Sequence, residues 1–412
     1  MMATNEKTCC RSVLSAVWVG ATFFNALVYS AETPKTNSLP DEYTPDPGER
    51  THLWQHGELA LKSWSSLNPH IVHEPESEYP FKMWYYAWKG WGVDANPGYP
   101  GCDANFFARS KDLKDWQVWG GKHHWVSWDK LDLWEPVTTI PDMPSFYNNH
   151  DNGDPSVVRH NGRYYMVYSA AGWNIGGKEY GKKFIICVMA AESDDGINWT
   201  KSKEPILIWN PQIGKMTRRK FPGPGPYYGG YACPSLMRDQ ERWKVWFQYG
   251  MDFDLGYAEN SGDFLDPNSW DILNKDDRPQ LHAWPNPDIT KVDNVYYGYT
   301  EVNLNEHGWE WVSRGGREAP WLFCEAVSEN GKDWQVLGWI RPREGIHHYQ
   351  VPEAFSIREN GQTWIYLFYS VPVAGKDPYD FRNRYIHYMK RPVDPAKDLA
   401  LAKSMKIRSA NP

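Results

Sequence analysis

The chain contains few cysteines and almost no segment with the hydrophobic periodicity of an α-helix. Six cysteines occur in 412 residues, and two of them lie within the first 31 residues. The other four form no CxxC pair and no His/Cys spacing typical of zinc, so neither a disulfide-built fold nor a metal centre of that kind is expected. One optional disulfide is possible. The scarcity of helical periodicity favours an all-β fold.

Excess positive charge is also missing. The formal net charge is −7 and the sequence pI is near 6.0, which argues against a general nucleic-acid binder. One uncharged apolar run, Ser12 to Tyr29, follows Lys7 and Arg11 and precedes the small residues Ser30 and Ala31. This order is typical of a secretory signal peptide over residues 1–31, and we expect a secreted or periplasmic protein with no membrane attachment after cleavage. A membrane anchor is disfavoured because the run is short and broken by Asn25.

Aromatic residues are abundant, with 24 Trp and 25 Tyr, and many of them belong to a repeated hairpin. In the copy from Gly153 to Ser169, a strand that begins with Asp154-Pro155 leads through Asn161-Gly162 into an alternating aromatic strand. An Asn-Gly pair between two such strands is a hairpin signal. Four further copies begin at Asn68-Pro69, Cys233-Pro234, Asn286-Pro287 and Glu353-Ala354.

A second motif follows three of the hairpins and supplies two more strands. It contains a serine, a tight polar turn and a tryptophan, in the segments Ala108 to Trp116, Ala191 to Trp199 and Ala326 to Trp334. Four strands repeated five times predict a five-bladed β-propeller with four-stranded antiparallel blades. We expect the propeller over residues 60–391, an N-terminal arm or linker over 32–59 and a C-terminal tail over 392–412.

Loop lengths indicate which face of the propeller carries a site. The first-to-second-strand turns are short, whereas the second-to-third-strand connections and the links between blades are long. Long loops over one end of rigid sheets are where binding and catalytic residues gather. The residues that begin the first strands should point into this face near the axis: Asn68, Asp154, Cys233, Asn286 and Glu353.

The chain resembles the five-bladed propeller glycoside hydrolases, in particular the arabinanase and β-xylosidase type (family 43) and the related anhydrogalactosidases (family 117). The resemblance lies in Asp154-Pro155 opening one blade, Glu353-Ala354 opening a later one, and the Ala-x-Ser-x-Asp-Gly-x-x-Trp turn. It implies a glycosidase with a general base, a general acid and a third carboxylate. By matching blade positions, Asp154 would be the base and Glu353 the acid.

The third carboxylate has no direct counterpart at a blade start, where the chain has Asn68, Cys233 or Asn286. Glu301 ends a second strand in the slot that Ser169 has in its blade, and it is our candidate for an additional catalytic carboxylate. His150 and His348 lie just before Asp154 and Glu353, and histidine can serve as acid or base near neutral pH.

The remaining candidates are residues of the long-loop face that could bind substrate. Aromatic members could stack on sugar rings, and basic members could bind sulfate or carboxylate groups. The substrate-binding set comprises Asn68, Trp88, Asp151, Trp173, Arg218, Tyr228, Asp254, Asn286 and Arg314.

The sequence therefore favours an exported, exo-acting glycoside hydrolase that cleaves an oligo- or polysaccharide, with an anionic glycan as one option. A polysaccharide lyase that uses His348, Tyr349 and Arg218 or Arg219 is an alternative, and a non-catalytic carbohydrate-binding propeller is another. No cofactor is required and no metal ligands are assigned; a structural calcium ion in the axial channel would agree with the resemblance. The sugar, its linkage and the oligomeric state are left open.

Overall fold

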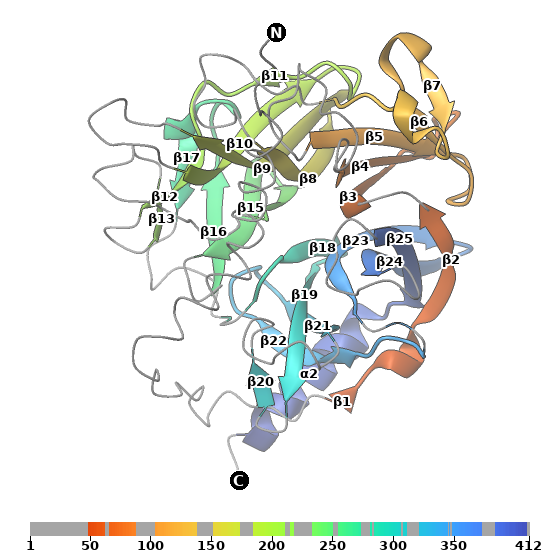
Figure 1. The fold of residues 1–412 in the computed structure, drawn as a ribbon. Helices are drawn as coiled ribbons and strands as arrows, with labels where there is room; N and C mark the ends of the chain where they lie inside the picture. The colour runs from red at the N-terminus through yellow and green to blue at the C-terminus, as the bar shows by residue number, and fades with distance from the viewer. Residues whose placement is uncertain are drawn as a thin grey trace, which may run out of the picture.

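The computed structural model describes residues 48–409, apart from 62–65, 88–103, 138–150, 174–183, 211–214, 218–232, 250–253, 273–280, 282–283, 306–307, 311–320, 345, 347 and 373–383. Five sheets of four to six strands stand around a central axis (Figure 1). The predicted all-β, five-bladed propeller is confirmed. Within the described residues, no helix is both long enough and apolar enough to span a membrane.

Each sheet is one blade, and its strands follow one another outward from the axis. Blade one contains β3 (Ser66–His73), β4 (Phe81–Ala87), β5 (Ala104–Ser110), β6 (Trp116–Trp119) and β7 (Trp125–Ser127). Blade two contains β8 (Asp151–His160), β9 (Arg163–Trp173), β10 (Phe184–Ser193), β11 (Thr200–Lys201), β12 (Leu207–Asn210) and β13 (Lys215–Thr217). Blade three contains β14 (Ser235–Asp239), β15 (Arg242–Tyr249), β16 (Asp254–Asn260) and β17 (Trp270–Ile272).

Blades four and five take strands from both ends of the chain. Blade four contains β18 (Asp288–Val292), β19 (Val295–Asn305), β20 (Gly308–Glu310), β21 (Trp321–Ser328) and β22 (Gln335–Ile340), and β1 (Gly48–Glu49) pairs with β22 in parallel. Blade five contains β23 (Gln350–Glu359), β24 (Gln362–Pro372) and β25 (Arg384–Pro392), and its outermost strand is β2 (Gln55–Leu61). Strand β2 thus closes the ring, and the segment expected as an arm contributes strands to two blades.

The hairpin turns have the backbone that their sequence requires. Asn161 and Gly162 both have positive φ, at 49° and 81°, and so do Asn360 and Gly361, at 50° and 81°. Two consecutive residues with positive φ match the right-handed twist of the flanking strands, and Asn-Gly reaches that conformation at low cost. The predicted hairpins are therefore present.

The polar turn of the second motif is built identically in blades two and four. Ser193 Oγ accepts the main-chain N–H of Gly196 over 2.9 Å, and Ser328 Oγ accepts that of Gly331 over 2.9 Å. Both glycines have positive φ, at 77° and 75°, which favours glycine there. The turn in blade one has the same plan with Leu113 in that position.

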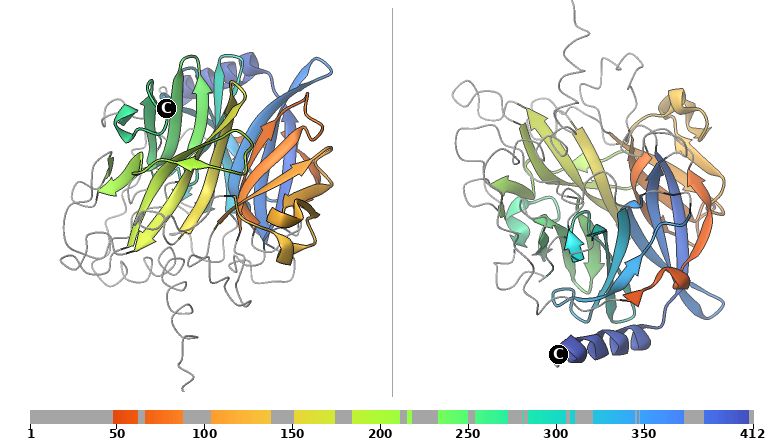
Figure 2. Two further views of the ribbon diagram at one scale, coloured as in Figure 1. Left: turned by 90° about the horizontal axis from the view of Figure 1, so that it is seen from above. Right: turned by 60° about the horizontal axis from the view of Figure 1, so that its bottom comes forward.

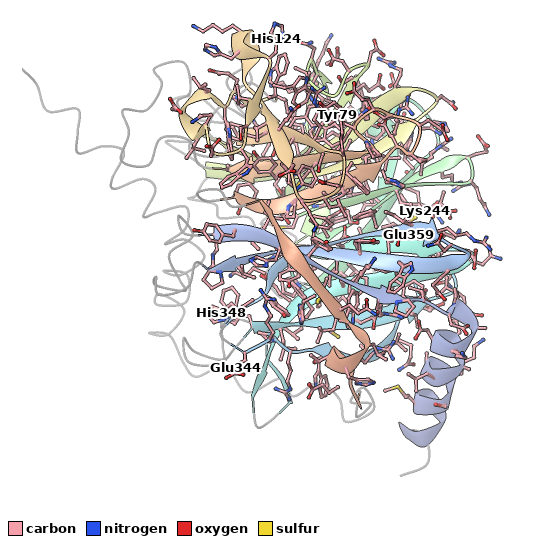
Figure 3. The ribbon with its side chains drawn as sticks, turned by 90° about the vertical axis from the view of Figure 1, so that its right-hand side faces the viewer. Tyr79, His124, Lys244, Glu344, His348 and Glu359 are labelled. Carbon is pink, nitrogen blue, oxygen red and sulfur yellow. The ribbon has the colours of Figure 1, made fainter. Side chains whose placement is uncertain are left out.

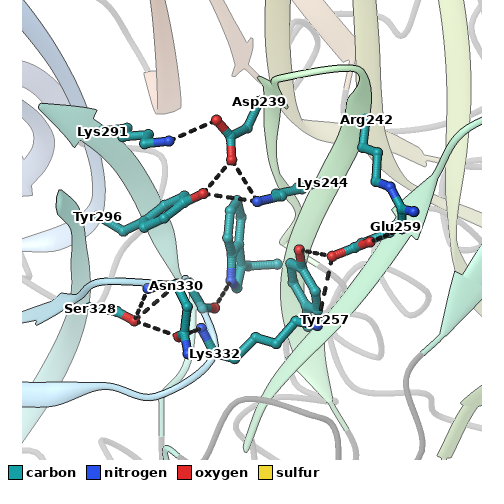
Figure 4. A network of polar contacts seen from close by, with 12 residues as sticks. Asp239, Arg242, Lys244, Tyr257, Glu259, Lys291, Tyr296, Ser328, Asn330 and Lys332 are labelled. Carbon is teal, nitrogen blue, oxygen red and sulfur yellow. Dashed lines mark hydrogen bonds and ion pairs between the residues drawn. The ribbon is translucent and has the colours of Figure 1, made fainter. Parts of the chain in front are cut away.

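Neighbouring blades are joined by a repeated polar contact. At the seam of blades three and four, Asp239 accepts hydrogen bonds from Lys244, Lys291 and Tyr296 (Figure 4). At the seam of blades one and two, Glu74 accepts from Lys82 and Tyr164 and lies 3.6 Å from Arg159 in the same arrangement. Blades one and two therefore dock as blades three and four do.

A tryptophan beside each of these polar contacts reinforces the docking. Trp84 donates to the Gly196 carbonyl over 3.0 Å, and Trp246 donates to the Gly331 carbonyl over 2.8 Å. Both indole rings are completely buried. Such large apolar side chains contribute strongly to burial, and the N–H of each ring has the partner that burial demands.

The C-terminal helix α2 (Pro395–Ser409) lies outside the ring of sheets, next to blade four (Figure 2). A buried ionic cluster attaches it: Asp398 of α2 binds Arg50 over 2.9 Å and Arg391 over 3.0 Å, and both arginines bind Glu325. The N-terminal segment, the last strand and the helix are thus fastened to one point of blade four.

Candidate active site

Five residues at the starts of the blades share an unusual backbone. Asn68, Asp154, Cys233, Asn286 and Val351 all have positive φ, between 31° and 47°, and each precedes a proline. The register of β3, β8 and β23 with their partners shifts at this dipeptide. Such a bulge turns a side chain out of the regular alternation of a strand. We name these five residues the rim ring.

The rim ring corrects the alignment of the fifth blade. The alignment of the repeats along the sequence placed Glu353 opposite Asp154. The residue of blade five that has positive φ and precedes a proline is Val351, two positions earlier. The repeated unit is therefore X-Pro-Y, with Val351-Pro352-Glu353 as its fifth copy.

The Y residues form a second ring, which we name the axial ring: His70, Ser156, Ser235, Asp288 and Glu353. Each side chain bonds to the main chain of the residue that follows the Y residue of the next blade. Ser156 accepts from Leu236, Ser235 from Ile289 and Asp288 from Ala354. His70 bonds to Val157 and Glu353 to Ile71 in the same manner. This ring ties the five blades together around the axis.

Asp154 is a buried carboxylate held by neutral donors. Asn68 Nδ2 donates to its Oδ1, Cys233 Sγ lies 3.5 Å from its Oδ2, and Ser169 also bonds to it. Asp154 is only 8% exposed. Burial raises the pKa of Asp154, and the three hydrogen bonds act in the opposite direction. These donors favour the ionised form that a base or nucleophile needs.

Glu301 lies on the second strand of blade four, β19, which continues past it to Asn305, so the expected position at a strand end is wrong. Its Oε1 accepts from Asn286 Nδ2 and its Oε2 accepts from the Val351 main-chain N–H over 2.9 Å. Ser169 accepts the Cys233 main-chain N–H over 3.0 Å in the same way, so the predicted equivalence of the Glu301 and Ser169 slots is confirmed. Glu301 is 6% exposed, and burial raises its pKa to about 7.

Asp154 and Glu301 act on each other electrostatically. The Asp154 charge raises the pKa of Glu301, while the buried Arg384 at the start of β25 lowers it. Both pKa values are raised, but the two carboxyl groups have different hydrogen-bond and charge environments, and such a pair can divide acid and base roles. The rim ring, with Ser169 and Glu301 of the second strands, thus forms a candidate catalytic centre.

Gln248 occupies the same slot in blade three that Ser169 and Glu301 occupy in theirs. It is 2% exposed, and its Nε2 has no hydrogen-bond partner among the described residues. A buried amide that lacks a partner costs free energy. A substrate oxygen at this end of the axis would satisfy it, so Gln248 is a candidate binding residue.

The axial ring contains the donors that a cation would need. One atom each of His70, Asp288 and Glu353 lies within 4.8 Å of the others, and all three residues are buried. Among the residues that the structure describes, Glu353 Oε1 has no hydrogen-bond partner, although it lies 2.7 Å from His70 Nδ1. Two ligand atoms at that separation can share one ion, and carboxylate with imidazole suits a divalent cation. These residues fit the calcium site that the resemblance implies.

Other predicted residues have varied positions. His348 is completely buried, and its Nδ1 accepts the Trp321 main-chain N–H over 3.2 Å. It lies at the end of the sheets opposite to Lys244 and Glu359 (Figure 3). Asp254 begins β16 and is 8% exposed. Asp151 and Trp173 lie on β8 and β9, but their side chains are outside the described part of the chain. His150, Trp88, Arg218, Tyr228 and Arg314 also fall outside the described residues.

Comparison with solved structures gives only distant likenesses. A thermostable family-43 glycoside hydrolase is 12% identical, with a TM-score of 0.47, over 81% of this chain and 95% of that one. A family-43 β-xylosidase/α-arabinofuranosidase from a compost microbial metagenome, in complex with xylotriose in a calcium-free form, is 14% identical, with a TM-score of 0.47, over 83% and 94%. Sucrose-6-phosphate hydrolase from Lactobacillus gasseri is 15% identical, with a TM-score of 0.49, over 82% and 60%.

These likenesses concern the fold. No family model matches the sequence, and no curated protein is similar to it at the sequence level. The assignment of chemistry therefore depends on the residues around the axis.

Sequence reasoning assigned no role in the site to five of these residues. Cys233 was expected only to point into the face, His70 and Asp288 counted only as strand residues, and Gln248 and Arg384 were not considered. The signal for the first three was the X-Pro-Y unit, which occurs five times when counted on the proline. Gln248 follows from the same register as Glu301, whereas nothing local marks Arg384.

Proposed function

We propose that this protein is a glycoside hydrolase whose catalytic pair is Asp154 and Glu301. The observation that carries the proposal is the environment of the two carboxyl groups. Both are buried at the rim of the axis, Asp154 receives three neutral donors, and Glu301 has a pKa of about 7. Glycoside hydrolysis needs one ionised and one protonated carboxyl group beside the scissile bond.

Asp154 would act as the base or nucleophile and Glu301 as the general acid. Burial keeps a large fraction of Glu301 protonated near neutral pH, so it can donate a proton to the leaving oxygen. Glu353, to which the resemblance gave the acid role, contacts His70 and Asp288 of the axial ring. Its contacts support a role in holding the blades, and the acid role passes to Glu301.

The substrate would bind over the rim ring. Asn68 and Asn286 each direct an amide towards a catalytic carboxylate, and the remaining hydrogen-bonding capacity of these amides can contact sugar hydroxyl groups. Gln248 supplies a third amide at the same end of the axis. Exo action, an anionic glycan and export are finer parts of the proposal; export depends on residues 1–31 and the anionic substrate on the basic segment 215–220.

The lyase alternative has less support. Its base pair would include Tyr349, but this residue is completely buried, stacks on Phe323 at 5.2 Å and accepts the Arg343 main-chain N–H. Tyr349 therefore belongs to the seam of blades four and five. A non-catalytic binding protein would have no need for two buried carboxyl groups of displaced pKa, whose burial costs free energy.

A calcium ion is a further part of the proposal. His70, Asp288 and Glu353 would hold it, and its charge would balance the two buried carboxyl groups of the axial ring. Its contribution would be to the stability of the closed ring, and no proton transfer depends on it.

The experiment is product analysis on a panel of neutral, uronic and sulfated oligosaccharides, with reducing ends and ultraviolet absorbance recorded together. We expect wild type and the surface variant Glu329→Gln to release sugar without absorbance. Asp154→Asn and Glu301→Gln should lose a factor of about 10² to 10⁴ in kcat/KM. Increasing absorbance would indicate a lyase, and full activity of Glu301→Gln would transfer the acid role back to Glu353.

A further inference from the structure

Cys233 lies at the rim of the axis, beside the proposed base. Its φ is 31°, Pro234 follows it, and its main-chain N–H donates to Ser169 Oγ over 3.0 Å. Only 6% of the residue is exposed. Pro234 and the Ser169 contact restrict the backbone at Cys233, which sets the direction of the side chain.

The thiol is directed at Asp154. Cys233 Sγ lies 3.5 Å from Asp154 Oδ2, within the range of an S–H···O hydrogen bond. Burial raises the pKa of the Cys233 thiol well above its ordinary value, and the charge of Asp154 raises it further. The thiol is therefore protonated at neutral pH and donates to the carboxylate. A nucleophilic role would need the thiolate, which this environment disfavours.

The two rim neighbours of Asp154 divide its oxygens between them. Asn68 donates to Oδ1 from one side and Cys233 to Oδ2 from the other, and neither adds a charge. Among the described residues, the charged or titratable groups that act on the site are Glu301, whose pKa the Asp154 charge raises, and Arg384, which acts on Glu301. A carboxylate in place of Cys233 would set a like charge next to Oδ2 and hinder ionisation of Asp154.

We propose that Cys233 is a positioning residue whose neutral thiol orients Oδ2 of Asp154 and keeps a second negative charge away from it. The inference rests on the proposed function, because it assigns Asp154 as the base. The hydrogen bond from Cys233 to Asp154 is also present in the free protein, so the inference can be tested without substrate.

The substrate-free test is infrared spectroscopy of the S–H stretch. Cys187 and Cys324 are buried thiols that point to main-chain carbonyls over 3.7 and 3.9 Å, and they serve as internal references. The band lost in Cys233→Ser should be the one most displaced to low frequency, and it should move towards the reference bands in Asp154→Asn. A Cys233 band that does not respond to Asp154→Asn would overturn the inference, whatever the catalytic activity.

The kinetic test is the pH dependence of kcat/KM for a series at this position. Cys233→Ser keeps a neutral donor and should retain the acidic limb of wild type or shift it lower. Cys233→Ala should shift that limb upward and lower kcat more than it raises KM, and Cys233→Asp should shift it upward by about one pH unit or more. Cys187→Ala, which changes a thiol in the core of the blade one and two seam, should leave the limb unchanged.

The two hypotheses fail in different ways. If the wild-type protein hydrolyses no member of the panel, the proposed function fails. The infrared spectra still show whether the Cys233 thiol donates to Asp154. With hydrolysis and equal acidic limbs for wild type, Cys233→Ala and Cys233→Asp, the positioning role fails and the glycosidase remains.

Discussion

The main-chain N–H of Val351 donates to Oε2 of Glu301 over 2.9 Å. This bond joins the rim of blade five to the second strand of blade four, β19, and it fixes the carboxyl group of Glu301 beside the rim ring. It stabilises the ionised form of Glu301, yet burial outweighs it and leaves the pKa of Glu301 at about 7. This balance suits Glu301 to the proposed role of proton donor near neutral pH.

The first prediction concerns the pH profile. A general acid must be protonated, so activity that depends on Glu301 is present below its pKa and is lost as the pH rises through about 7. Asp154 must be ionised, and its raised pKa places the acidic limb above the ordinary value of an aspartate. We expect a bell-shaped dependence of kcat/KM with an alkaline limb near pH 7. A flat profile to pH 9 would contradict the assignment of Glu301.

The second prediction concerns Arg384, which is completely buried and whose charge lowers the pKa of Glu301. Arg384→Met should move the alkaline limb upward by about one pH unit, because the ionised form loses a favourable charge. Arg384→Lys keeps the charge and should restore most of the wild-type profile. The exposed Arg341, which pairs with Glu49 over 3.0 Å, offers a control: Arg341→Met should leave the limb in place.

The third prediction concerns the ionic cluster that holds α2. Glu325 is completely buried between Arg50 and Arg391, and although burial alone would raise its pKa, the two arginines hold it below the ordinary value. Glu325→Gln would leave two buried guanidinium groups with Asp398 as their remaining carboxylate in the cluster, and it should reduce the free energy of unfolding by about 3 to 5 kcal/mol. Denaturant titration measures the difference.

The matched control for this cluster is Glu329→Gln. Glu329 is exposed and pairs with Lys403 of α2 over 3.1 Å. An exposed pair contributes less than about 1 kcal/mol. Similar losses of unfolding free energy in Glu325→Gln and Glu329→Gln would show that the buried cluster contributes no more stability than an exposed ion pair.

The fourth prediction concerns the axial ring. We expect calcium to raise the melting temperature of the chelator-treated protein, since a ligand held at about 100 times its Kd stabilises by about 2.7 kcal/mol. Asp288→Asn removes one of the three donors and should abolish the increase. Asp239→Asn alters a buried carboxylate at a blade seam, and calcium should still raise the melting temperature of this variant. An equal calcium-dependent increase in the melting temperature of both variants would show that the ion binds outside the axial ring.

Much of the fold could be predicted from local sequence because its signals are local. Asn161-Gly162 specifies a hairpin through its positive φ values, and Ser193 with Gly196 specifies the polar turn through two short-range hydrogen bonds. The hairpin itself occurs five times, and this repetition determines the number of blades. The closing strand β2 has no such signal, because its pairing with β25 joins residues more than 300 positions apart.

The site was only partly predictable, for a reason that lies in the bulges. Along a regular strand the side chains alternate between the two faces, so position along the sequence tells which residues share a face. The X-Pro bulge adds a residue and breaks that alternation, and counting along the sequence therefore confused Val351 with Glu353.

The sequence by itself determined the propeller, Asp154 as its leading carboxylate and the shared slot of Ser169 and Glu301. Tertiary structure alone decided that Glu301 of blade four acts on Asp154 of blade two, that Glu353 belongs to the axial ring, and that Cys233 meets Asp154. These relationships come from separate blades that converge on one axis. Burial around that axis, which no single segment encodes, sets the protonation of each group.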